Sequence, residues 1–121
     1  MEILIGLTML YLLFVGYNKI TAPKVNQVNG RQLSEMLEDK KAKRQYIDVR
    51  TTGEFNSRKI KGFKNIPLDQ LTKRKSEIDP EMEVVVMCAS GSRSMRAVKM
   101  LNKMGYKNLT NVKGGISSVQ L

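Results

Sequence analysis

One segment of the chain combines a nucleophile with backbone suited to holding an anion. Cys88 is the only cysteine, and it directly follows the apolar run Val84–Met87. The small residues of positions 89–92, Ala-Ser-Gly-Ser, then lead into a helix-like pattern that begins near Ser94. Small residues let the backbone curl, so successive N–H groups can point to one place at the positive end of the helix. The spacing predicts a strand, a tight loop and a helix, with the Cys88 thiol at the first loop position.

The surroundings predicted for Cys88 are those that turn a thiol into a nucleophile. A helix N-terminus and a nearby guanidinium, here that of Arg93, lower the pKa of a thiol and favour the thiolate. The alternative is that Cys88 merely fills space at the end of a strand. A loop of small residues would pack such a filler poorly, so the loop favours a catalytic Cys88. The predicted cradle around the sulfur consists of Ala89, Ser90, Gly91, Ser92, Arg93 and Ser94.

Composition narrows the chemistry further. The chain has no histidine, which excludes Ser-His and Cys-His nucleophiles and the usual zinc sites. Activation of a nucleophile must therefore come from backbone dipoles and from Arg or Lys charges, and we expect neither a metal nor a cofactor. A single cysteine cannot form an intramolecular disulfide, and a reducing compartment would keep it as a thiol.

The net charge of +10 raises the question of a nucleic acid partner. The basic residues are spread along the chain after residue 18, and no aromatic stacking pattern accompanies them. We therefore do not expect nucleic acid to be a partner. Diffuse positive charge also suits a domain held beside an anionic membrane leaflet.

The first residues differ from the rest of the chain. Ile3–Tyr17 carries no charge and is almost entirely apolar, which predicts one transmembrane helix over residues 1–20 that contacts membrane lipid. A cleaved signal peptide is the alternative, but the segment lacks a basic start and a small-residue cleavage site. All Lys and Arg residues follow it, so we expect a single-pass protein of the cell membrane with its N-terminus outside. Residues 21–25 would be a linker and 26–121 a cytoplasmic domain.

Strands and helices are expected to alternate within that domain. The apolar patterns predict strands at residues 25–28, 45–50, 65–66, 83–87 and 106–112. They predict helices from residue 29 or 30 to about 39, and over 51–58, 68–78, 93–104 and 116–121. Such alternation is typical of an α/β fold with a mainly parallel central sheet flanked by helices. Reactive sites of these folds lie at the carboxyl edge of the sheet, where Cys88 falls.

Charged residues follow the second expected strand. Asp48 and Arg50 are two positions apart and so share one face of that strand. We expect Arg50 to pair with Glu54 and to fix this corner. The alternative, a general acid at Asp48 or Glu54, is less favoured because carboxylates beside Arg commonly serve as structural clamps.

Four segments, in this order, resemble the single-domain rhodanese-like sulfurtransferases. They are residues 47–50 (Ile-Asp-Val-Arg) with Glu54-Phe55 downstream, residues 60–67 (IKGFKNIP), residues 88–94 (CASGSRS) and residues 112–116 (VKGGI). The resemblance covers roughly residues 26–121. With the N-terminal membrane helix, the chain is also similar to small bacterial rhodanese-domain proteins.

The resemblance implies a specific activity. Cys88 would take a sulfane sulfur from thiosulfate or a low-molecular-weight persulfide, hold it as a persulfide, and pass it to a thiol acceptor or to cyanide. The N–H groups of residues 89–93 would hold the persulfide, and Arg93 would neutralise the donor. Asp48, Arg50 and Glu54 would be structural supports. The partners implied are a small sulfur donor and a thiol acceptor, which can also belong to a protein.

Two departures and two rival functions accompany the resemblance. Lys59 stands where the family commonly has His, and Ala89 where it often has Arg or Lys, which leaves the choice of donor open. Cysteine phosphatases and arsenate reductases of similar architecture place five residues between Cys and Arg, whereas four separate Cys88 from Arg93. The other rival is a membrane-anchored binding module without catalysis.

Overall fold

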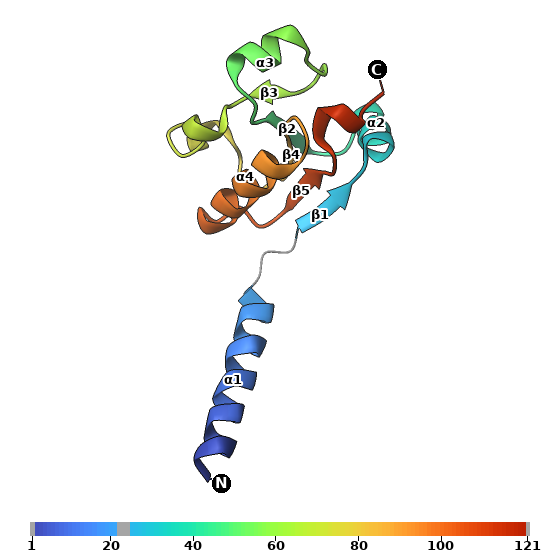
Figure 1. Cartoon of the computed structure of the whole chain (residues 1–121). Coiled ribbons are helices and arrows are strands. Elements are labelled where there is room, and N and C mark those ends of the chain that lie inside the picture. Colours follow the sequence, from blue (N-terminus) through green and yellow to red (C-terminus); the bar gives the residue numbers. More distant parts are fainter. Residues whose placement is uncertain (1, 22–24, 121) are drawn as a thin grey trace.

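The computed structural model describes residues 2–21 and 25–120. Helix α1 (Glu2–Thr21) projects away from the part of the chain that holds all the strands (Figure 1). Five strands form one sheet in the order β1-β5-β4-β2-β3, and every neighbouring pair is parallel. The predicted α/β fold with a mainly parallel sheet is therefore confirmed.

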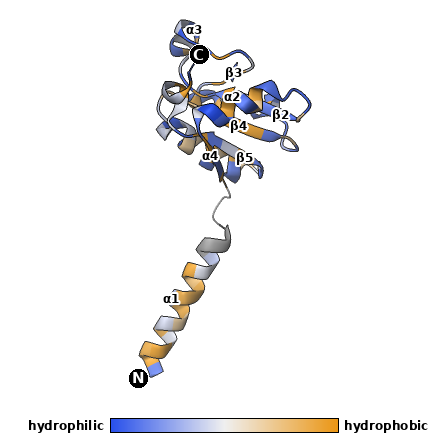
Figure 2. Ribbon diagram, turned by 90° about the vertical axis from the view of Figure 1, so that its right-hand side faces the viewer, coloured by the Kyte–Doolittle hydropathy of each residue, from blue (hydrophilic) through white to orange (hydrophobic). Residues whose placement is uncertain are grey.

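Helix α1 is mostly apolar over residues 3–17, and its large apolar side chains there are exposed (Figure 2). Among the helices within the described part of the chain, none is both long enough and apolar enough to cross a membrane. The uncharged run Ile3–Tyr17 would span about 22 Å as a helix, less than the ~30 Å hydrocarbon core of a bilayer. The transmembrane helix predicted over residues 1–20 is thus not supported.

The strands are short and lie close to the positions expected from the sequence. They are β1 (Val25–Val28), β2 (Arg44–Asp48), β3 (Lys64–Asn65), β4 (Glu83–Met87) and β5 (Leu109–Val112). In the central pair, Asp48 of β2 is the register partner of Met87 of β4. The residues that follow these two strands, including Cys88, therefore leave the sheet side by side.

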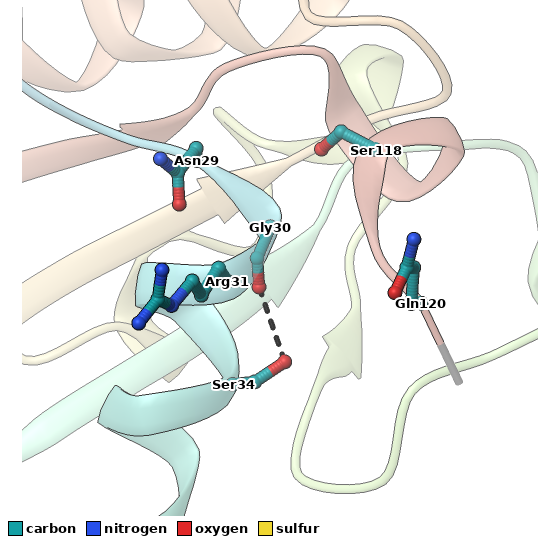
Figure 3. Close-up of a pocket in the computed structure, with 6 residues that line it drawn as sticks. All are labelled: Asn29, Gly30, Arg31, Ser34, Ser118 and Gln120. Carbon is teal, nitrogen blue, oxygen red and sulfur yellow. Dashed lines mark hydrogen bonds between the residues drawn. The ribbon is translucent and has the colours of Figure 1, made fainter.

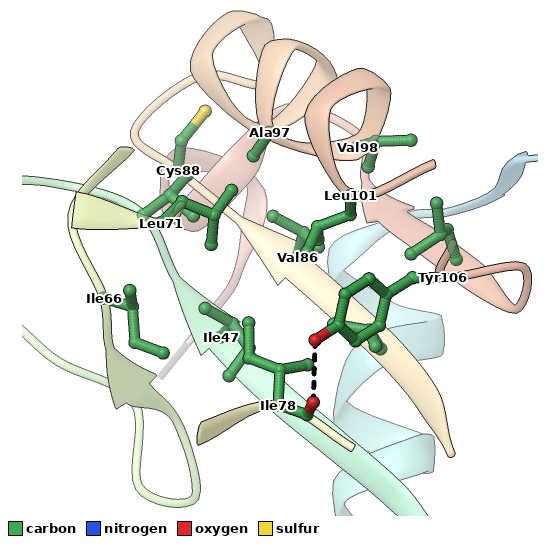
Figure 4. Close-up of a cluster of buried hydrophobic side chains, with 13 residues drawn as sticks. Ile47, Ile66, Leu71, Ile78, Val86, Cys88, Ala97, Val98, Leu101 and Tyr106 are labelled. Carbon is green, nitrogen blue, oxygen red and sulfur yellow. Dashed lines mark hydrogen bonds between the residues drawn. The ribbon is translucent and has the colours of Figure 1, made fainter. Parts of the chain in front are cut away.

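Helices cover both faces of the sheet. Helix α4 (Ser92–Lys103) packs on one face, while α2 (Gly30–Glu38) and the short C-terminal 3-10 helix Gly115–Ser118 pack on the other. Side chains of a strand alternate between faces, so Val84 and Val86 pack on the α4 side. Cys88 continues that alternation and lies in the same buried cluster (Figure 4). The alternation thus sets the thiol on the face that α4 covers.

Two segments differ from the predicted helices. The helix expected over residues 68–78 is replaced by two 3-10 turns, Leu68–Gln70 (η1) and Lys75–Glu77 (η2). Leu71 and Ile78 are both buried, but Arg74 and Lys75 occupy the positions that a continuous apolar helix face would need. The helix expected over 116–121 is likewise a 3-10 turn, η3 (Gly115–Ser118), in the described residues. The remaining helix, α3 (Thr52–Ser57), is within the predicted range.

Candidate active site

The loop between β4 and α4 wraps around the sulfur of Cys88. The N–H of Gly91 donates to the Cys88 Sγ at 2.9 Å, which closes the loop into a tight turn. Gly91 has φ of 110°, a left-handed conformation that side chains other than glycine's rarely adopt. Helix α4 begins at the next residue, Ser92, so its positive end is adjacent to the sulfur. The predicted strand, loop and helix are all present.

Ser94 completes the polar surroundings of the thiol. Its side chain is fully buried, and the Cys88 thiol donates to its hydroxyl oxygen over 3.4 Å. The Ser94 hydroxyl in turn donates to the carbonyl of Gly91 at 2.9 Å. One hydroxyl therefore links the sulfur to the backbone of the turn that encloses it.

The loop favours the thiolate of Cys88. Burial alone raises the pKa of this thiol, because it disfavours the charged form. Hydrogen bonds involving the Ser94 side chain and the backbone N–H groups of Ser94, Gly91 and Ser90 act in the opposite direction and are stronger together. The resulting pKa of Cys88 lies below that of an ordinary thiol, as expected for a nucleophile.

The C-terminal turn η3 supports the loop from behind. The N–H of Ile116 donates to the carbonyl of Cys88 at 2.8 Å, and the N–H and hydroxyl of Ser117 donate to the carbonyl of Ala89 at 3.2 and 2.9 Å. A Cβ on Gly115 would lie 2.6 Å from the backbone carbon of Ala89, so only glycine fits this contact. The double glycine of residues 114 and 115 therefore lets η3 approach the loop closely.

Arg93, in the first turn of α4, pairs with Glu54. Its guanidinium donates two hydrogen bonds to the Glu54 carboxylate, at 2.7 and 2.9 Å. The bonds from Arg93, with further bonds from Thr51, lower the pKa of the Glu54 carboxyl to about 2. The role predicted for Arg93, neutralising the sulfur donor, stays a prediction, and its charge is shared with a carboxylate in this structure.

Asp48 and Arg50 form a buried pair at the end of β2. The Arg50 guanidinium donates to both carboxylate oxygens of Asp48, with the shortest bond at 2.7 Å. The predicted carboxylate pairing of Arg50 with Glu54 is wrong, because Arg50 reaches only the backbone carbonyl of Glu54. Arg50 lies two residues after Asp48, just beyond the end of β2, and its backbone N–H also donates to the Asp48 carboxylate at 3.0 Å. The side chain of Asn65 then donates to the carbonyls of Asp48 and Arg50, which fixes the end of β2.

One cavity of the structure lies apart from this site. A cavity of about 530 Å³ opens at the start of α2, lined by residues such as Arg31, Ser34 and Gln120, and none of its lining residues belongs to the Cys88 loop (Figure 3). Over the described ranges 2–21 and 25–120, no three His, Cys, Asp or Glu side chains come together as a metal site would require.

Comparison with known proteins places the chain among its relatives. A family model described as "Rhodanese-like domain" matches residues 30–121. The Bacillus subtilis protein YqhL is 45% identical over 73 residues, which cover 60% of this chain and 58% of YqhL. A protein of Allochromatium vinosum named "Sulfurtransferase" is 34% identical over 92 residues, covering 76% of this chain and 85% of its own length. This chain thus spans little more than half of YqhL.

A solved structure agrees with the assignment of the fold. The rhodanese-like domain protein of Staphylococcus aureus superposes with a TM-score of 0.72 at 27% identity. The match covers 78% of this chain and 91% of that protein. The sheet and the helices on its two faces are therefore shared by both proteins.

Proposed function

Because the chain belongs to the rhodanese-like domain family, we propose that it is a sulfurtransferase whose Cys88 carries a sulfane sulfur as a persulfide. The donor would be thiosulfate or a low-molecular-weight persulfide, and the acceptor a thiol or cyanide. The observation that carries the proposal is the hydrogen bond of 2.9 Å from the Gly91 N–H to the Cys88 Sγ, at the end of a helix that favours an anion. The name of the Allochromatium relative agrees with this activity.

The first half-reaction would load the cysteine. The Cys88 thiolate attacks the outer sulfur of the donor, and a new S–S bond forms at Sγ. The S–S bond of the donor breaks, and its electron pair leaves with sulfite from thiosulfate or with a thiolate from an organic persulfide. The backbone donors of residues 90–94 that favour the thiolate would also stabilise the anionic persulfide.

The second half-reaction would return the enzyme to its starting state. An acceptor thiolate attacks the outer sulfur of the Cys88 persulfide and forms a new S–S bond with it. The bond between that sulfur and Sγ breaks, and the electron pair returns to Sγ, so Cys88 becomes a thiolate again. The two steps together move one neutral sulfur atom and need no external oxidant or reductant.

The rival function as a phosphatase or arsenate reductase has less support. Four residues, rather than five, separate Cys88 from Arg93, so the loop is shorter than the one those enzymes wrap around a tetrahedral anion. The Arg93 guanidinium is also held by Glu54, whereas a phosphate would need it free. A single sulfur atom bound to Cys88 is smaller than a tetrahedral phosphate or arsenate, so it suits the shorter loop better.

The location of the protein is a separate proposal. We propose that α1 holds the chain at the cell membrane, with the N-terminus outside and the domain on the cytoplasmic side. Large apolar side chains of α1 are exposed, and every Lys and Arg follows residue 18. A short apolar run is accommodated in a bilayer by local thinning or by flanking side chains that extend to the interface. Retention of the full chain in a carbonate-washed membrane pellet, and its loss on Leu10→Arg, would test this.

The persulfide itself is the direct test of the function. The full chain, purified in a mild detergent, is incubated with thiosulfate or with glutathione persulfide, and its intact mass is measured. A gain of one sulfur, about 32 Da, that dithiothreitol removes is expected for the wild type. Cys88→Ser should show no gain. If neither donor adds mass to the wild type, the sulfurtransferase proposal is overturned.

A further inference from the structure

We propose that the groove between α4 and η1 binds the body of an amino-acid or small peptide thiol, with Arg96 holding its carboxylate. The inference rests on the proposed function and names the class of thiol that exchanges sulfur with Cys88. Three observations support it: the groove lies beside the Cys88 loop, one of the two arginines that line it is unpaired among the described residues, and its volume suits a small molecule.

The groove adjoins the Cys88 loop. Val49 of its wall packs in the same buried cluster as Cys88, and the N–H of Val49 donates to the carbonyl of Met87 at 2.9 Å. Arg93, in the first turn of α4 directly after the loop, lines the groove as well. A ligand in the groove therefore lies against residues that directly contact the catalytic segment.

The face of α4 that lines the groove presents one free cation. Arg93, Arg96 and Met100 are three and four positions apart, and so lie along one side of the helix. Arg93 is held by the two hydrogen bonds from its guanidinium to Glu54. Arg96 is exposed and has no ion pair or side-chain hydrogen bond within the described part of the chain. An anionic group entering this groove would meet Arg96 as the unpaired guanidinium.

The remaining walls favour an organic ligand over a small inorganic anion. Val49, Leu68 and Met100 give the groove an apolar lining, and its volume of about 410 Å³ is in the range of small-molecule sites. Asp69 lies on the same groove and adds a negative charge. A molecule with a carboxylate, an ammonium group and a carbon skeleton, such as an amino-acid thiol, matches both charges and the apolar surface.

The sulfur exchange would then occur at the end of the groove. The thiolate of the bound ligand attacks the outer sulfur of the Cys88 persulfide, the bond from that sulfur to Sγ breaks, and Sγ keeps the electron pair. The ligand leaves as its own persulfide. Arg96 takes no part in these bond changes, so its effect is expected on the recognition of the thiol and not on the loading of Cys88 from thiosulfate.

The test separates recognition from chemistry. The full chain is first loaded with thiosulfate, and the rate of persulfide loss to each acceptor is followed by intact mass over a range of acceptor concentrations. Glutathione carries the charges that the groove should bind, and 2-mercaptoethanol is neutral. For Arg96→Glu we expect the second-order rate constant with glutathione to fall about tenfold through weaker binding, and that with 2-mercaptoethanol to stay unchanged. Comparing each variant with the wild type cancels the intrinsic reactivities of the two thiols.

Matched variants complete the design. Lys99→Glu makes the same change of charge on an exposed position of α4 that does not line the groove, and it should leave both rates unchanged. Arg96→Gln should lower the rate constant with glutathione less than Arg96→Glu does. Arg96→Lys keeps the positive charge and should retain part of the wild-type rate constant. Equal rates for wild type and Arg96→Glu with glutathione, or equal losses with both thiols, would overturn the inference while the loading of Cys88 stands. A wild type that never loads would instead overturn the proposed function and the inference with it.

Discussion

The carboxylate of Glu54 and the guanidinium of Arg93 are joined by two hydrogen bonds that connect helix α3 to the first turn of α4. Glu54 also closes the capping box of α3, because its side chain accepts from the N–H of Thr51 at 3.1 Å. One carboxylate thus caps one helix and holds the Cys88 loop at the start of another. Acid should disturb both contacts at once.

Protonation of Glu54 is expected to reduce stability only in acid. Its pKa is about 2 in the folded chain and near 4.5 without its partners, so the unfolded chain binds the proton first as the pH falls. The stabilisation is therefore complete above about pH 5 and is lost towards pH 2. Because the pair is over one-third exposed, we expect a contribution of only about 1 kcal/mol. Urea unfolding at pH 7 and pH 3 should show a smaller difference for Glu54→Gln than for the wild type.

Glu77 is a matched control, because its pKa is lowered to a similar value but its contacts lie away from the Cys88 loop. Glu77 also has a pKa of about 2, chiefly because of Arg74, but it lies in η2 and contacts none of the loop residues. Glu77→Gln should reduce the acid sensitivity of unfolding without changing the rate at which Cys88 is loaded. If Glu54→Gln keeps the full acid sensitivity of the wild type, the pair with Arg93 contributes nothing to stability.

Ser94 should set the pH at which Cys88 ionises. Once the thiol has lost its proton, the Ser94 hydroxyl can donate to the sulfur, and this hydrogen bond is the largest of the contributions that lower the pKa of Cys88, so Ser94→Ala should raise that pKa. Cys88 is the only cysteine, and the absorbance of a thiolate near 240 nm can therefore be assigned to it. A titration below the range of tyrosine ionisation should show its midpoint at higher pH in the variant, and loading from thiosulfate should slow at neutral pH.

The control for Ser94 is a serine remote from the thiol. Ser76 is exposed in η2 and has no side-chain hydrogen bond in the described part of the chain. Ser76→Ala should titrate like the wild type. An unchanged midpoint in Ser94→Ala would mean that the backbone N–H groups alone account for the lowered pKa.

Local patterns in the sequence were enough to predict the strand, the loop and the helix around Cys88. The apolar run before Cys88 and the small residues after it indicated a strand, a loop and a helix, and alternation along the strand explains the face on which the sulfur lies. Asp48 and Arg50 are paired, but β2 ends at Asp48, so the strand face that they were expected to share does not extend to Arg50. These relations depend on residues within a few positions of one another.

Contacts between distant segments could not be predicted in the same way. The sequence placed Arg50 near Glu54, but the Glu54 carboxylate pairs with Arg93, which is 39 positions away in the sequence. Only the positions of α3 and α4 in the folded chain determine this pairing. The support of Cys88 and Ala89 by residues 115–117 depends on how η3 meets the loop. Residues 68–78 form two 3-10 turns instead of the expected helix, although Leu71 and Ile78, which suggested that helix, are both buried.

Gly115 is expected to tolerate no side chain. It has φ of 60°, and a Cβ would lie 2.6 Å from the backbone of Ala89, so Gly115→Ala must displace the loop. We expect a loss of about 1–3 kcal/mol in the free energy of unfolding and slower loading of Cys88. Gly53→Ala is the control, because a Cβ there has no atom within 4 Å and lies in helix α3. Normal loading in Gly115→Ala would contradict the supporting role of η3.

Removing one member of the buried pair of Asp48 and Arg50 is expected to reduce the stability of the fold more than replacing both. Asp48 is fully buried and Arg50 is 4% exposed, so Asp48→Ala leaves a guanidinium without its carboxylate in the interior. Loss of one partner of such a pair typically costs about 3–5 kcal/mol. The double variant Asp48→Leu, Arg50→Met removes both charges at similar volume and should unfold at a higher denaturant concentration than Asp48→Ala alone. Guanidinium chloride unfolding of the three chains checks this order. A double variant that is less stable than Asp48→Ala would show that Arg50 acts mainly through its bonds to the carbonyls of Glu54 and Arg58.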